Sequence, residues 1–130
     1  MKNRIYAVII ISFSLGLIYL IIAGNIEGSD IDKNGKIIIG KYVARDKWGK
    51  YRSNYFSYYV GKEKHKSGGG VGPIDFYKNI GKFYKIKYLD KYPEAIHPLY
   101  EQEVTDTAEI LNAGFSMDDI LNKKENNLFP

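Results

Sequence analysis

The 130-residue chain contains no cysteine. This absence excludes disulfide bonds, thiolate catalysis, cysteine metal ligands and a lipid-modified N-terminal cysteine. Histidine is scarce: the chain has only His65 and His97. Neither stands in the His-x-x-x-His or Glu-x-x-His spacing of zinc enzymes. Charge is absent from residues 5–23, and this uncharged stretch determines how the rest of the sequence is interpreted.

The stretch from Ile5 to Ala23 predicts a transmembrane helix. Its 19 residues would rise about 28 Å as an α-helix, close to the roughly 30 Å hydrocarbon core of a bilayer. No polar face recurs at helical spacing, as it would in an amphipathic soluble helix. Tyr6 and Tyr19 lie near its two ends, where amphipathic rings favour the membrane interface. Residues 1–23 are therefore predicted to be an N-terminal anchor whose partner is the lipid bilayer.

The charges on either side of this stretch predict its orientation. Lys2 and Arg4 precede it, whereas Glu27, Asp30 and Asp32 are the first charged residues that follow. The positive-inside rule then places the N-terminus in the cytoplasm and the rest of the chain outside a cell inner membrane, as a single-pass protein.

A cleaved signal peptide is the alternative interpretation, because it has the same basic start. Its apolar region usually runs about 7–15 residues and ends in small residues of the Ala-x-Ala type. Here the run is longer, and Ile21 stands two positions before Ala23. The pattern favours an uncleaved anchor, while cleavage would leave a small secreted protein. A water-soluble buried helix fits less well than either.

The formal net charge of +4 conceals an uneven distribution. Residues 33–91 carry 15 Lys/Arg against four acidic residues, whereas residues 92–130 carry eight acidic residues against two lysines. One interpretation is that the basic middle consists of solvated lysine faces. The other is that it meets anionic lipid or an anionic polymer, or is partly covered by its own acidic tail.

Hydrophobic periodicity after the anchor predicts a mainly β fold. Residues 24–35 are predicted to be a polar linker, and residues 36–104 a small antiparallel β domain. Its five predicted strands are 36–47, 51–60, 62–67, 82–89 and 95–103. In the fourth strand Tyr84, Ile86 and Tyr88 share one face. Without intervening helices, these strands predict a five-stranded meander or small barrel.

The sequence also predicts an edge strand, a loop and a helical tail. Pro98 predicts that the last strand is at an edge of the sheet. Residues 67–73 are predicted to be a glycine-rich loop. Residues 105–130 are predicted to be an acidic tail with one or two short helices, beginning at Asp106 and Ser116 and ending in a frayed segment, 123–130. The tyrosine-rich stripe is interpreted as core rather than as a ligand surface.

Three stretches partly match ligand-binding motifs. Asp30 to Gly35 has the start of a calcium loop, but Lys41 occupies position 12, where the loop needs a bidentate glutamate. Residues 35–41 have the spacing of a phosphate-binding loop, but Tyr42 replaces the Ser/Thr that would hold magnesium. Residues 67–73 could be an anion cradle, but the segment that follows is too short to predict a helix. We therefore expect no metal and no cofactor.

Enzymatic activity is not predicted, because no catalytic set is recognisable. Glu101 and Glu103 share a strand face, and Asp118 and Asp119 are adjacent. Nothing in the sequence marks either pair as buried and perturbed. A nucleic-acid binder is an alternative, since lysines and tyrosines interleave in the basic middle. It is less favoured because the predicted orientation places the domain away from nucleic acid.

Three stretches carry a resemblance to a group of proteins. They are Gly40-Lys41-Tyr42-Val43, Tyr55 to Lys62, and Gly81 to Tyr88 with Tyr92-Pro93 after it. They resemble uncharacterised bacterial single-span membrane proteins with a small β-barrel-like domain, and residues 103–111 resemble the tail of such proteins. The resemblance implies a membrane-anchored domain without an assigned activity. Together, these observations predict a non-enzymatic interaction or envelope-associated module.

Overall fold

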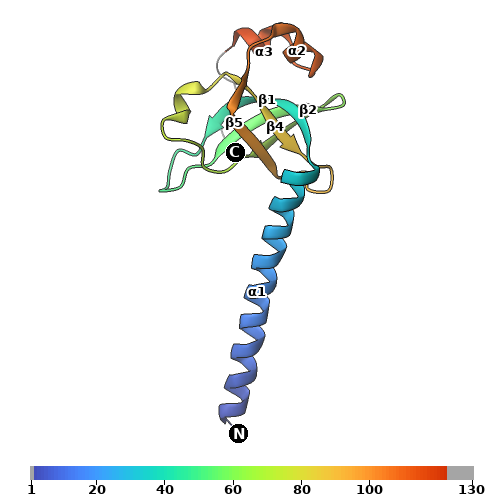
Figure 1. Cartoon of the computed structure of the whole chain (residues 1–130). Coiled ribbons are helices and arrows are strands. Elements are labelled where there is room, and N and C mark those ends of the chain that lie inside the picture. The colour runs from blue at the N-terminus through green and yellow to red at the C-terminus, as the bar shows by residue number, and fades with distance from the viewer. Residues whose placement is uncertain (1, 123–130) are drawn as a thin grey trace.

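A computed structural model of the chain describes residues 2–122. One long helix, α1, runs from the N-terminus to a small β domain, with two short helices at the far end of that domain (Figure 1). Of the described helices, α1 is the one long and apolar enough to cross a membrane. Its side chains between residues 2 and 26 are exposed all round.

Helix α1 spans Lys2–Asn34 and does not end at Ala23. Residues 24–34, which the sequence predicts to be a linker, are helical, so that prediction is corrected at the level of local structure. Gly24 and Gly28 each weaken a helix by about 1 kcal/mol relative to alanine. The helix persists because its last turns dock on the sheet, where Ile31 is only 1% exposed. Tertiary packing of this kind routinely overrides local propensity.

The sheet has five antiparallel strands in the order β3-β2-β1-β4-β5. Their bounds are β1 Lys36–Arg45, β2 Asn54–Val60, β3 Glu63–Gly68, β4 Phe83–Tyr88 and β5 Ile96–Val104. All five predicted strands are present, although β2 begins at Asn54 rather than at residue 51, and the prediction of a sequential meander is wrong. After β3 the chain crosses back through residues 69–82, which include the short 3-10 helix η1, Phe76–Asn79, so that β4 pairs with β1.

The sheet curves but does not close, so the prediction of a barrel is also corrected. Its edge strands meet only at a parallel bridge between Gly68 and Ala95. Strand β5 is at an edge, as Pro98 predicts, because proline lacks the amide that a further strand would need.

Two apolar clusters occupy the two faces of the sheet. The first is aromatic and lies on the concave side: Tyr42, Phe56, Tyr58, Phe76, Tyr84, Ile86, Tyr88 and Ile96. The second lies beneath the C-terminal helices: Ile39, Phe83, Val104, Ile110 and Phe115. The prediction that Tyr84, Ile86 and Tyr88 share a buried face is confirmed. The interpretation of the tyrosines as core is likewise confirmed for these clustered rings.

The two C-terminal helices begin where the sequence predicts. Helix α2, Thr107–Asn112, has Asp106 as its N-cap, and helix α3, Met117–Leu121, has a capping box formed by Ser116 and Asp119. They cover the second cluster at the end of the domain away from α1 (Figure 1). The predicted frayed end, residues 123–130, lies outside the described residues.

Candidate functional site

The junction between α1 and the sheet is the first candidate site, because it fixes how the domain stands on the helix. The Lys87 ammonium on β4 donates to the Asp32 carbonyl at 2.9 Å and to Asp32 Oδ1 at 3.1 Å. Lys91 lies 3.7 Å from Asp30 Oδ2, to which the Tyr92 hydroxyl also donates. These bonds surround Ile31 and attach the last turns of α1 to the β4–β5 hairpin.

The carboxylates of this junction are stabilised in their charged form. The hydrogen bond from the Asn34 amide, with smaller contributions from Lys91 and Tyr92, holds the pKa of Asp30 below its ordinary value. The hydrogen bond and charge of Lys87 do the same for the pKa of Asp32. Part of the basic middle is thus neutralised by acids that precede it in sequence.

The junction explains the calcium-like motif at Asp30 to Gly35. The stretch from Asp30 to Asn34 forms the end of α1, and its carboxylates face lysines rather than one another. Among residues 2–122, no group of three or more acidic or histidine side chains is placed to hold a metal.

Residues 36–41 belong to β1, so the stretch 35–41 does not form a phosphate loop. Lys41 is 2% exposed, and its ammonium donates to the Asn122 carbonyl at 2.7 Å. It therefore ties the central strand to the end of α3. The sequence did not indicate this contact, because a lysine on a strand is normally solvated.

The amides of Gly69 and Gly70 in the glycine-rich loop are bonded within the chain. The Gly69 amide donates to the Asn54 carbonyl, and the Gly70 amide donates to Ser53 Oγ, so neither is available to an anion. A Cβ added to Gly69 would lie 2.3 Å from Pro98 Cγ. The glycines allow the loop to pass against β5, which accounts for this composition without a ligand.

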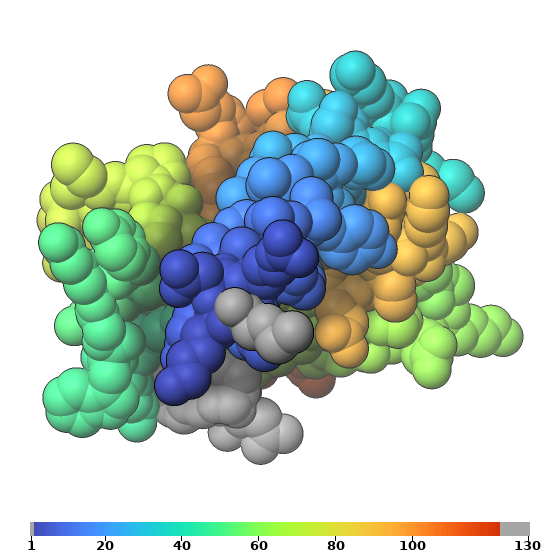
Figure 2. All heavy atoms as spheres, turned by 90° about the horizontal axis from the view of Figure 1, so that it is seen from below, coloured from blue at the N-terminus to red at the C-terminus, as the bar shows by residue number. Residues whose placement is uncertain are grey.

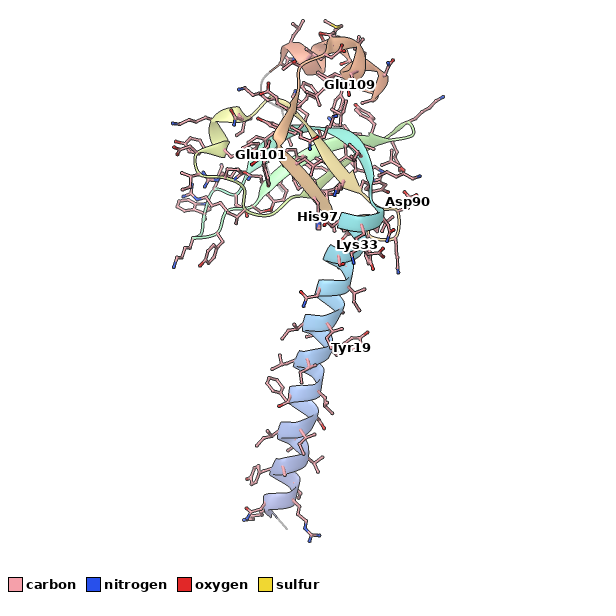
Figure 3. The ribbon with its side chains drawn as sticks, viewed as in Figure 1. Tyr19, Lys33, Asp90, His97, Glu101 and Glu109 are labelled. Atoms are coloured by element: carbon pink, nitrogen blue, oxygen red, sulfur yellow. The ribbon has the colours of Figure 1, made fainter. Side chains whose placement is uncertain are left out.

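The histidines and paired carboxylates that were considered for catalysis do not come together in one site. His65 lies on β3 and stacks on Tyr58, whereas His97 lies on β5 beside the α1 junction (Figure 3). Glu103, an exposed residue of β5, lies 3.5 Å from Lys82, and Glu101 on the same strand is exposed as well.

The pair Asp118 and Asp119 belongs to the first turn of α3. The Asp119 carboxylate accepts hydrogen bonds from the Ser116 amide and hydroxyl, which is the work of a helix cap. Its role in the described structure is to start a helix.

A groove of about 520 Å³ lies where β1 ends and η1 passes, and its lining combines apolar side chains, Val43, Ala44 and Ile80, with charged ones. Arg45, Lys47 and Arg52 contribute to it together with Asp46 and the ring of Tyr77. The Arg45 guanidinium lies 5.3 Å from the centre of the Tyr77 ring. The sequence indicated a basic middle but not that these three cations would converge.

Comparison of the chain with protein-family models, with curated proteins and with solved structures finds no match. The resemblance to membrane-anchored barrel proteins therefore stays a prediction, and function has to be argued from this chain's own geometry.

Proposed function

We propose that the chain is a single-pass protein of the cell inner membrane that presents a small non-enzymatic interaction domain on the outer surface. The observation that carries the proposal is the continuity of α1. The same helix that contains the apolar stretch continues beyond it and docks on the sheet through Ile31. A tether of this kind holds its domain at a defined height and orientation.

The helix also favours retention of the anchor over its removal. Signal cleavage would take place where the apolar region ends, and here that region is the interior of a regular helix. The charges at the two ends of α1 support a cytoplasmic N-terminus. The buried tyrosines leave fewer rings for base stacking than the sequence alone suggested, so a nucleic-acid partner is less well supported.

The absence of cysteine allows a direct test of topology. We would introduce one cysteine at a time, in the Asn3→Cys and Lys62→Cys variants, and treat intact cells with a membrane-impermeant maleimide. Lys62 is exposed in the turn between β2 and β3. We expect labelling of the Lys62→Cys variant only, with labelling of the Asn3→Cys variant after the cells are opened.

Fractionation tests the tether itself. The full chain should remain with membranes after carbonate and high-salt washes. Release by carbonate would contradict a transmembrane anchor. A soluble product that begins near Asn25 would instead show a secreted domain, and labelling of the Asn3→Cys variant alone in intact cells would reverse the orientation.

A further inference from the structure

The loop between β1 and β2, residues 46–53, lies on the side of the domain from which α1 descends. In Figure 1 it is the teal-green loop at the lower left, where the domain overhangs the helix. Figure 2 looks along α1 toward the domain, and the same teal-green segment stands beside the helix without being covered by it. A membrane spanned by α1 would face this loop.

The composition of the loop matches a membrane interface. Trp48 is 86% exposed and Tyr51 is 75% exposed. Both residue types are enriched where one part of a ring meets apolar chains and the other meets water. Lys47, Lys50 and Arg52 accompany them, and the Lys50 ammonium lies 5.6 Å from the centre of the Tyr51 ring.

The base of the loop is built to present these side chains. The Asp46 carboxylate accepts hydrogen bonds from the Ser53 amide at 3.0 Å and from the Tyr55 hydroxyl at 2.8 Å. The Asp46 amide donates to the Ser53 carbonyl at 3.0 Å. The one acidic residue of the loop is thereby engaged by its own base, while the aromatic rings stay outside.

The groove described above, at the end of β1, adjoins this loop. Arg52 and Lys47 belong to both, and Arg45 extends the positive lining toward η1. Guanidinium groups bind phosphate oxygens in a bidentate manner. Three cations and one acid make up the charged part of the groove's lining, so this part is suited to the phosphate of a lipid headgroup.

We propose that residues 46–53, with the groove at their base, form a second membrane contact that binds anionic phospholipid headgroups of the bilayer spanned by α1. Trp48 and Tyr51 enter the interface, and Lys50 and Arg52 meet the phosphates. The inference rests on the tether proposed above.

The helix geometry sets a condition for this contact. The eleven residues from Gly24 to Asn34 lift the junction by roughly 16 Å above the apolar stretch. The headgroup layer on each side of a bilayer is only about 5–8 Å thick. The contact therefore requires α1 to tilt toward the loop, and transmembrane helices tilt by about 20° on average. The loop would fix the direction of that tilt.

Trp48 is the only tryptophan in the chain, so its fluorescence reports on this loop alone. The full chain would be reconstituted into vesicles of phosphatidylcholine, or of phosphatidylcholine and phosphatidylglycerol in equal parts. In the mixed vesicles we expect a blue-shifted emission and quenching by brominated acyl chains. Quenching by aqueous iodide should fall about twofold, because immersion halves the ring area open to collision.

Charge variants test the lipid preference with a matched control. The Lys50→Glu/Arg52→Glu variant should lose the protection of Trp48, and high salt should weaken it in the native chain. The Lys62→Glu/Lys64→Glu variant makes the same change of charge at two exposed residues, one in the turn after β2 and one in β3, and should keep the protection.

Flotation separates the two proposals. If the chain fails to float with the vesicles, the tether is wrong. If it floats but iodide quenches Trp48 equally in both lipid mixtures and in the loop variant, the tether stands and the loop contact is refuted. Equal loss of protection in both charge variants would also overturn it, because the loop would then have no special role.

Discussion

Replacing Ile31 by alanine should release the last turns of α1 from the sheet. Ile31 is 1% exposed, and the substitution removes three carbon groups worth about 0.8 kcal/mol each. The cavity left behind adds to this loss, and similar core truncations cost about 2–5 kcal/mol. We expect about 3 kcal/mol. Alanine itself favours a helix by a few tenths of a kcal/mol over isoleucine, so weaker helix propensity cannot cause the effect.

Amide hydrogen exchange of the full chain in lipid nanodiscs measures this loss directly. The opening free energy of residues 28–34 should fall by about 3 kcal/mol, which accelerates exchange roughly hundredfold. The control is Ile26→Ala, the same change on the same helix at a side chain that is 56% exposed. Indistinguishable exchange in the two variants would refute the claim that α1 is docked through Ile31.

Three further outcomes follow from the packing and the pKa shifts. The hydrogen bond from Lys87 holds the pKa of Asp32 below its ordinary 3.8. The stability that this bond gives is therefore present above pH 3.8 and is lost as the pH falls through the lower pKa of the folded state. Amide exchange at the junction should rise in acid, and should rise less steeply in the Asp32→Asn variant. Burial raises the pKa of both Tyr42 and Tyr84 from 10.0 to about 12. Their contribution to the free energy of unfolding is therefore complete below pH 10 and is lost as the pH rises toward 12. Tyrosinate absorbance and loss of near-UV circular dichroism should appear together in that range. Gly69→Ala should cost about 3 kcal/mol through its clash with the proline ring beneath it, whereas Gly70→Ala, with φ of 75° and open space around it, should cost about 1 kcal/mol by thermal unfolding.

Local patterns predicted the strands but not their arrangement. The alternation of Tyr84, Ile86 and Tyr88 is a property of neighbouring residues, and it identified both β4 and its buried face. The pairing of Gly40 with Tyr84 joins residues far apart in sequence, so periodicity carries no information about it. For the same reason a sequential meander was predicted where the chain crosses over between β3 and β4.

The two features on which the proposals rest had weak sequence signals. Glycines and acidic residues in the stretch 24–35 indicated a linker. The helix nevertheless continues to Asn34, because Ile31 is buried against the sheet. Trp48 fell between two predicted strands, whereas Tyr51 was predicted to begin the second strand, so its exposure in the loop before β2 was not foreseen. Only the placement of this loop on the α1 side of the domain (Figures 1 and 2) suggests what the exposed rings could contact.

Alanine insertions between Gly24 and Asn25 can establish whether the apolar stretch of α1 contacts lipid alone or also a protein partner. Two alanines rotate the domain by about 200° relative to the apolar stretch and lift it about 3 Å. Seven alanines restore the rotation to within about 20° but lift the domain by about 10 Å. Because α1 is apolar on all sides, it can roll freely in lipid, and only the lift should matter.

Protection of Trp48 from aqueous iodide should therefore survive the two-residue insertion and disappear with seven. Loss of protection with two alanines but not with seven would mean that one face of α1 is held in place within the membrane. Only in a helix that cannot roll would rotating the domain move Trp48 away from the headgroups. That result would replace a lipid-only anchor by one with a protein partner along its length.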